Sequence, residues 1–298
     1  MIVHDAHCHF LTKRFFEALG REKYGERFVS AEATAGEMGW EMIDDATELA
    51  QRWVAELDEH HLSRAALIAS VPGDEDSVAA AVERYPDRFV GFFSVDASAS
   101  DAEEHVARAF AGQRLRCACL FPAMHGYSYQ DRCVFKLFEA AARHQCAVFA
   151  HCGYLSIEAR VKLGVPRCFN LRLGDPLTLA ATAGHFPTVP VIIPHFGAGF
   201  LREAFMAGEM CPTIHLDTSS SNAWLRYFPE LTLAEVFRRA LLLVGPDRLL
   251  FGTDSSSFPR GWRRVIHGAQ RTALDEIGVE LEVKEKIFSK NFERLFKA

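Results

Sequence analysis

Long hydrophobic runs are absent from this sequence of 298 residues. No stretch of about 18 apolar residues occurs, which excludes a transmembrane helix of the usual length. The N-terminus also lacks the basic, then apolar, then small-residue order of a secretory signal, so we expect a cytoplasmic protein. Basic residues are in deficit as well, since 33 Lys and Arg stand against 39 Asp and Glu. A net charge of −6 argues against a nucleic-acid or anionic-membrane partner.

Paired cysteine motifs are missing too. The eight cysteines are scattered, and Cys117 and Cys119 have no zinc-knuckle spacing, so we expect reduced thiols. No internal repeat, low-complexity tract or Gly/Ser linker divides the chain. With 49% hydrophobic residues available for a core, the sequence predicts one domain over residues 1–298.

What the sequence does contain is a set of short apolar runs that each end in a metal-ligand side chain. Near the N-terminus, His7 and His9 follow Ile2 and Val3. Side chains two positions apart on a strand share a face, so both imidazoles can point at one place. Three later runs have the same ending, and they finish at His151, His195 and Asp254.

Strand and helix patterns alternate eight times along the chain. Strands are expected to begin near residue 2 and to occupy 64–70, 89–96, 115–121, 146–151, 189–195, 213–217 and 248–254. Helices are expected between them, among others at 45–60, 101–112, 131–144 and 176–185, with two at the end, 261–276 and 281–296. This alternation predicts an α/β fold, a (β/α)8 TIM barrel, with a helical insertion at residues 10–44. The active site of such a barrel lies at the strand ends.

A cluster of imidazoles and one carboxylate suits a divalent metal ion, above all Zn²⁺, with Mn²⁺ and Fe²⁺ as competitors. Each residue has an alternative interpretation. His151 alone could be a buried histidine bonded to the backbone, and Asp254 could cap the following turn. His195 could be a metal ligand rather than a catalytic group. Asp5 could orient the ring of His7 or make an ordinary strand-end hydrogen bond.

The motifs resemble those of the amidohydrolase superfamily. They are Asp-Ala-His-Cys-His-Phe at 5–10, the histidine that ends strand five, Pro-His-Phe-Gly at 194–197 and Phe-Gly-Thr-Asp at 251–254. They are most similar to the amidohydrolase-related branch, which includes aminocarboxymuconate-semialdehyde decarboxylase and many hydrolases. The resemblance implies that one metal is bound by His7, His9, His151 and Asp254. It also implies that His195 activates a bound water and that Asp254 accepts a proton.

The resemblance also concerns the number of metal ions. Dinuclear members of the superfamily use a carboxylated lysine at the end of strand four. Cys119 stands at that position here, which implies a mononuclear site.

Candidate substrate contacts lie in the loops after the strands. They are Arg172, Arg202 and Arg260, each able to bind a carboxylate, and Tyr127, Asn222 and Trp224 as lining groups.

We expect a small-molecule substrate. A homodimer is possible, and the sequence does not decide this. Hydrolysis of a C–O or C–N bond is favoured because it requires the fewest residues. The alternatives are a metal-dependent, non-oxidative decarboxylase and a metal-binding barrel without catalysis. A barrel without catalysis would have lost some of the metal-ligand residues, and none of them is missing from this sequence.

Overall fold

The computed structural model describes residues 1–220 and 223–297, and this part of the chain contains eight strands in one sheet. Neighbouring strands follow the order of the sequence, and each pair is parallel. The strands are β1 (His4–Phe10), β2 (Arg64–Ala69), β3 (Phe89–Val95), β4 (Cys117–Leu120), β5 (Ala147–Ala150), β6 (Val191–Ile193), β7 (Ile214–Asp217) and β8 (Leu249–Leu250).

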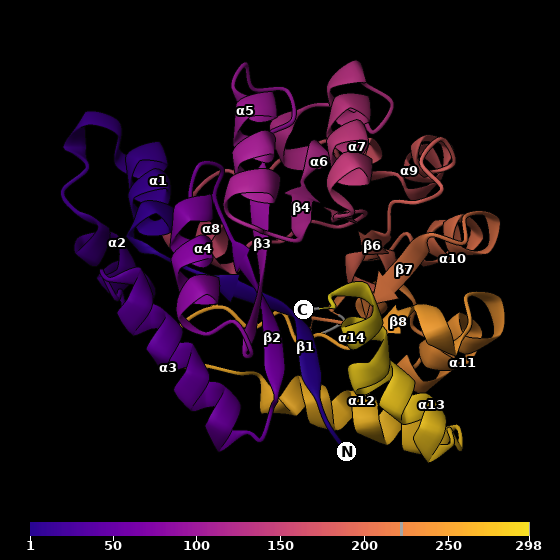
Figure 1. Ribbon diagram of the computed structural model, residues 1–298. Coiled ribbons are helices and arrows are strands. Elements are labelled where there is room, and N and C mark those ends of the chain that lie inside the picture. Colours follow the sequence, from indigo (N-terminus) through magenta and orange to yellow (C-terminus); the bar gives the residue numbers. More distant parts are fainter. Residues whose placement is uncertain (221–222, 298) are drawn as a thin grey trace.

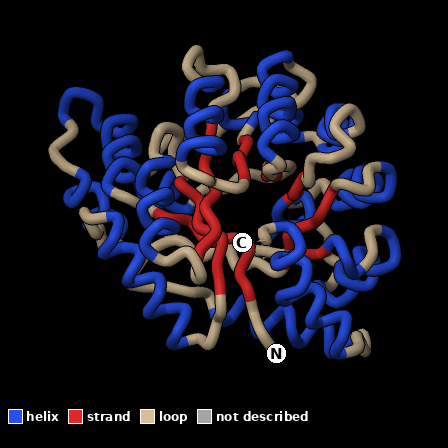
Figure 2. Tube along the Cα trace, in the orientation of Figure 1, coloured by secondary structure: helices blue, strands red, loops and turns tan. Residues whose placement is uncertain are grey.

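The sheet closes between its first and last strands. The Ala6 N–H donates to the Phe251 carbonyl at 2.8 Å, and the His9 N–H donates to the Ser255 carbonyl at 2.7 Å. Figure 2 shows the helices as a ring outside the strands. The fold is therefore the predicted (β/α)8 barrel.

One helix outside the barrel follows each strand. These helices are α3 (Ala46–Glu59), α4 (Glu75–Arg84), α5 (Ala102–Ala107), α7 (Arg132–His144), α9 (Pro176–Ala183), α10 (Leu201–Met210), α11 (Leu233–Leu243) and α12 (Arg264–Glu276). Additional helices lie in the loops and at the C-terminus, namely α1 (Lys13–Tyr24), α2 (Ala31–Met38), α6 (Pro122–His125), α8 (Glu158–Leu163), α13 (Leu281–Glu285) and α14 (Asn291–Leu295). None of the helices in the described ranges is long and apolar enough to cross a membrane.

Local sequence explains where these helices form. In α7 the buried residues Val134, Leu137, Phe138 and Ala141 recur at helical spacing, so one face packs on the barrel. At the start of α9 the Asp175 carboxylate accepts the Leu177 N–H at 2.8 Å, and Pro176 occupies the first helical position.

Several expected elements differ in extent. The helix expected over 101–112 changes to a π-helical turn at Arg108–Gly112, and the one expected over 281–296 contains another at Lys286–Lys290. Strand eight is regular only at Leu249–Leu250, and beyond it the Phe251 and Ser255 carbonyls accept single hydrogen bonds from β1. The second π-turn separates α13 from α14, whose Phe292 packs into the barrel interior together with Phe296. Figure 1 shows α14 lying across the barrel.

The insertion after β1 packs against the long segment after β5. Side chains from α1 and α2 form a separate apolar cluster with Ala159 and Leu163 of α8 and with Val165. The Arg160 guanidinium of α8 also pairs with Glu22 of α1, with one N–O distance of 2.7 Å. Two segments more than a hundred residues apart in sequence therefore form one layer beside the barrel (Figure 1).

Candidate metal centre and cavity

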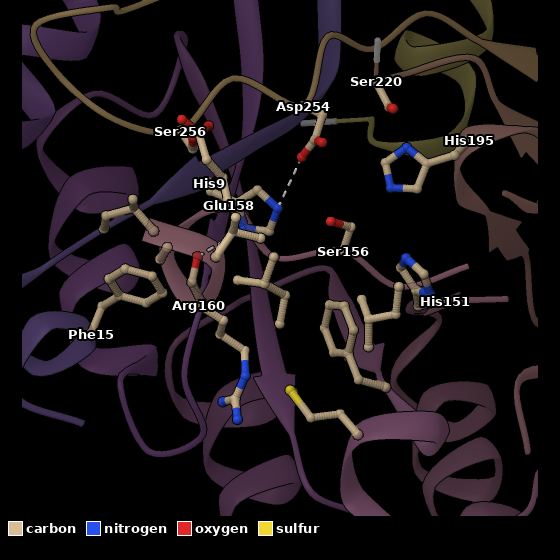
Figure 3. A pocket seen from close by; sticks show the side chains of 18 of the residues that line it. His9, Phe15, His151, Ser156, Glu158, Arg160, His195, Ser220, Asp254 and Ser256 are labelled. Atoms are coloured by element: carbon tan, nitrogen blue, oxygen red, sulfur yellow. Dashed lines mark hydrogen bonds and ion pairs between the residues drawn. The ribbon is translucent and has the colours of Figure 1, made fainter. Parts of the chain in front are cut away.

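Three ligand-type side chains meet where β1 and β8 end. The Nε2 atoms of His7 and His9 are 3.3 Å apart, and Asp254 Oδ1 lies 3.5 Å from the first and 3.2 Å from the second. Two atoms bound about 2.0–2.1 Å from one zinc ion at a tetrahedral angle are about 3.3–3.4 Å apart. The three atoms, called here the ligand triangle, thus have the spacing that one divalent ion requires. Figure 3 shows Asp254 directed toward His9.

His7 is oriented from β7. Its Nδ1 lies 2.6 Å from Oδ2 of Asp217, a fully buried carboxylate. Because a carboxylate only accepts hydrogen bonds, Nδ1 carries the proton and Nε2 keeps its lone pair for a metal. The Ser219 N–H donates to Oδ1 of Asp217 at 2.6 Å and holds the carboxylate in place.

His9 has the same tautomer for a different reason. The Ser70 hydroxyl donates to the Ile68 carbonyl at 3.1 Å, so its oxygen is left to accept the Nδ1–H of His9 at 2.9 Å. Once its proton is lost, the Nε2 atom of His9, which faces Asp254, has a lone pair for a metal as well. Both imidazoles thus direct Nε2 at the triangle.

Asp5 does not orient the ring of His7, in contrast to one of the two interpretations from the sequence. Its carboxylate accepts the backbone N–H of His7 at 2.9 Å and of Thr253 at 3.1 Å. It also accepts the indole N–H of Trp262 at 2.7 Å. Burial raises the pKa of Asp5 to about 6 despite these bonds. Asp5 thus joins β1 to the segment after β8. The ring of His7 is oriented by Asp217 instead.

His195 and His151 lie beside the ligand triangle. One nitrogen of His195 is within 4.8 Å of the ligand atoms of His7 and Asp254. The Ser219 hydroxyl donates to Asp217 at 2.9 Å, so its oxygen accepts the Nδ1–H of His195 at 2.9 Å and leaves Nε2 with a lone pair. The ring centroid of His151 is 5.5 Å from that of His195, and both line the same cavity (Figure 3). Either ring could complete a coordination sphere.

The charges of the site favour metal binding. Burial acts to raise the pKa of Asp254, but the hydrogen bond to His9 and the charges of His7 and His195 outweigh it and lower that pKa far below its ordinary value. Burial lowers the pKa of both His151 and His195. Burial acts to lower the pKa of His7 as well, but the charge and hydrogen bond of Asp217 outweigh it and raise that pKa, so a metal competes with a proton at this ring. The ionised Asp254 carboxylate and the neutral rings of His151 and His195 are protonation states that bind a divalent metal.

The backbone is strained at two of these residues. His195 has a φ of 56° and Asp254 a φ of 58°, in the left-handed region that residues other than glycine rarely adopt. Each such residue costs about 1–2 kcal/mol. Strain of this kind is typical of functional sites, where it directs a side chain that a regular strand would point elsewhere.

A cavity of about 710 Å³ opens at the ligand triangle. Much of its wall is apolar, and the aromatic ring of Phe121 stacks on His151 with centroids 5.5 Å apart and an interplanar angle of 27°. Further apolar side chains come from the insertion and from the loops, among them Leu11, Phe15, Trp40, Met124 and Phe169. The space is large enough for one small substrate.

Two of the six candidate substrate contacts line this cavity. Arg260 follows β8 and forms an ion pair with Glu158 at 2.7 Å. Trp224 is buried and contributes to the wall.

The others are placed differently. The side chain of Arg202 is 83% exposed, lies outside the cavity and pairs with Glu203. Arg172 is exposed and Tyr127 is buried in the core, and neither lines the cavity. These positions do not support substrate contact by Arg172, Arg202 or Tyr127. Asn222 lies outside the described residues.

Comparison of the sequence with known protein families agrees with a metal centre at this end of the barrel. A profile of the family described as amidohydrolase matches residues 4–298. The chain belongs to the amidohydrolase family. No curated protein matches the chain significantly. Membership in the amidohydrolase family makes the chain an enzyme.

Several solved structures resemble this amidohydrolase. The 5-carboxyvanillate decarboxylase of Sphingomonas paucimobilis has 13% identity and a TM-score of 0.67, with 99% of both chains covered. A dihydroxybenzoic acid decarboxylase of Polaromonas sp. JS666, solved with manganese and 2-nitroresorcinol, has 16% identity and a TM-score of 0.67 over 99% of this chain and 97% of that chain. A probable 2-pyrone-4,6-dicarboxylic acid hydrolase of Acinetobacter baumannii has 14% identity and a TM-score of 0.62 over 99% of both.

Sequence reasoning missed two residues of the amidohydrolase site. Asp217 ends an apolar run, Thr213 to Leu216, in the same way as the predicted ligands do, so the signal was present. Ser219 carries no such signal, because its contacts to His7 and His195 depend on the turn after β7.

Proposed function

We propose that this amidohydrolase is a metal-dependent, non-oxidative decarboxylase of aromatic acids, which reverses the preference for hydrolysis drawn from the sequence. The observation that carries the proposal is the largely apolar lining of the cavity, in which the ring of Phe121 stacks on His151. An aromatic ring fits such a wall, since rings prefer offset or edge contacts with other rings. The similarity to decarboxylases of hydroxylated benzoic acids adds support.

The metal would be held by His7, His9 and Asp254, with His151 or His195 completing the set. A single ion is proposed, and the manganese in similar decarboxylase structures makes Mn²⁺ a candidate beside Zn²⁺. When bound, such an ion supplies positive charge that draws electrons from an attached carboxylate or phenolate.

The protein's own residues have to manage one proton. In decarboxylation the bond between the ring carbon and the carboxylate breaks, carbon dioxide leaves, and the electron pair stays on the ring carbon. That carbon then takes up a proton, which comes in the end from solvent. His195 is suited to hold this proton at Nε2, because Ser219 engages its other nitrogen. Positioned proton transfer is worth roughly 10²- to 10⁴-fold in rate.

The test offers hydroxybenzoates and muconate-type acids beside lactones, esters and amides to the metal-loaded enzyme in D₂O. The expected result is carbon dioxide release from an acid, with deuterium at the vacated carbon. Hydrolysis is the second candidate, because one similar structure is named as a hydrolase and His195 with Asp254 would serve it as well. Turnover of a lactone, ester or amide without carbon dioxide from any acid would overturn decarboxylation.

A further inference from the structure

Four arginines in the described part of the chain line the cavity, and the guanidinium groups of three of them are already bonded. The bonded guanidinium groups, with their partners, are those of Arg160 with Glu22, Arg226 with Tyr154 and Tyr227, and Arg260 with Glu158 and Ser256. The fourth is Arg263. Its guanidinium forms no hydrogen bond or ion pair with any residue of 1–220 or 223–297, although its backbone N–H donates to Ser255 Oγ at 3.0 Å.

Arg263 is partly buried, and that makes an unpaired charge costly. Burial lowers the pKa of its guanidinium, and the charge of Asp254 opposes this shift. A cation that has lost part of its hydration without gaining a partner is destabilising, so an anion that enters the cavity is attracted to it. The planar guanidinium matches a carboxylate through two parallel hydrogen bonds.

The loop that carries Arg263 is fixed relative to the ligand triangle. The neighbouring Trp262 donates its backbone N–H to Glu56 at 2.8 Å and its indole N–H to Asp5 at 2.7 Å. The same Asp5 carboxylate accepts the backbone N–H of His7. Gly261 has a φ of +63°, and a Cβ there would lie 2.1 Å from a Glu56 oxygen, so the tight turn requires glycine. The separation between Arg263 and the triangle is therefore set by a shared buried anchor.

We propose that Arg263 binds a second acidic group of the substrate, so that this enzyme selects aromatic acids carrying one acidic group for the metal site and another for Arg263. The inference rests on the function proposed above for the substrate class. The second group is a carboxylate that stays on the ring through the reaction. A charge-assisted hydrogen bond of this kind corresponds to roughly 10- to 100-fold in affinity.

The kinetic test compares 4-hydroxybenzene-1,3-dicarboxylate with 2-hydroxybenzoate, which lacks the second carboxylate. Arg263→Met should lower kcat/KM for the diacid roughly 10- to 100-fold, mainly through KM, and leave the monoacid unchanged. Arg263→Lys should restore part of the loss. Arg226→Met is the matched control, since it removes another cavity arginine whose partners are known, and it should affect neither substrate. An equal loss on both substrates, or no loss on the diacid, would overturn the proposal.

A binding measurement separates this inference from the proposed reaction. Calorimetry with benzene-1,3-dicarboxylate and benzoate, which needs no turnover, is run on the metal-loaded enzyme and on Arg263→Met. Tighter binding of the diacid to the wild type, lost in the variant, supports the role of Arg263 even if no acid releases carbon dioxide. Equal binding of the two acids by the wild type contradicts that role even if decarboxylation is observed.

Discussion

Asp217→Asn tests the metal centre through a side chain that would touch no metal. The substitution keeps the shape of the side chain but replaces one oxygen by an amino group. The Ser219 N–H donates to Oδ1 at 2.6 Å and requires an oxygen there, so the amino group must face His7 Nδ1, now 2.6 Å from Oδ2. A donor at that position moves the proton of His7 onto Nε2, and a protonated nitrogen cannot bind a metal.

The size of the effect follows from the buried hydrogen bonds. Restoring the metal-binding tautomer of His7 would set two N–H donors against each other, which costs about 1–3 kcal/mol in a buried site. This agrees with the roughly 10- to 100-fold loss of metal affinity usual when the partner behind a ligating histidine is changed. We therefore expect the Kd for Zn²⁺ or Mn²⁺ to rise about 10- to 100-fold, measured near neutral pH by competition with a chelating indicator.

The control is another buried carboxylate that binds a histidine. Glu75 lies 2.5 Å from His105 Nδ1 outside the cavity, so Glu75→Gln should leave the metal Kd unchanged. Urea unfolding of the metal-free variants reports any loss of stability separately. A folded Asp217→Asn protein with the wild-type Kd would refute the assignment of His7 Nε2 as a ligand.

Further predictions concern the proton carrier, the metal, the core and the pH dependence. His195→Ala should keep its metal and lose roughly 10²- to 10⁴-fold in turnover, whereas loss of the metal would make His195 a ligand instead. Elemental analysis should find one divalent ion per chain, and less in Asp254→Ala; two ions would contradict the mononuclear site. In Gly252→Ala the new Cβ would lie 2.8 Å from Asp217 Oδ1, so stability in urea should fall by about 1–3 kcal/mol, and an unchanged midpoint would speak against this packing. Burial lowers the pKa of His267 from 6.5 to about 4, so below pH 6.5 the unfolded chain binds a proton that the folded chain does not. Stability should then fall by up to about 3 kcal/mol between pH 6.5 and 4, and His267→Phe should flatten that part of the urea-unfolding profile; an equally steep profile would reject this origin.

The fold and the ligand positions were predictable because they depend on local pattern. Each strand is a short apolar run, and a parallel barrel brings every strand end to one rim. His7, His9, His195 and Asp254 meet there for that reason, and the three atoms of the ligand triangle are 3.2–3.5 Å apart. The lengths of the last helices were less predictable, because the π-turn at Lys286–Lys290 is set by packing under the barrel.

The substrate contacts were less predictable, because a loop position does not determine where a long side chain points. Arg202 and Arg260 both follow strands, yet one is exposed to solvent and the other lines the cavity. Arg263, which lines it without a partner among the described residues, has no distinguishing feature in the sequence.

By itself, then, the sequence determined the barrel, the rim on which the site lies and the residue types available to hold a metal, because strand periodicity and chain order dictate these. Tertiary structure alone decided which nitrogen of each imidazole is free, since the tautomer of His7 depends on Asp217, which is 210 positions away in the chain. It also decided which cavity arginine has no partner among residues 1–220 and 223–297. Those choices depend on contacts between segments that are remote in sequence, and no local pattern encodes them.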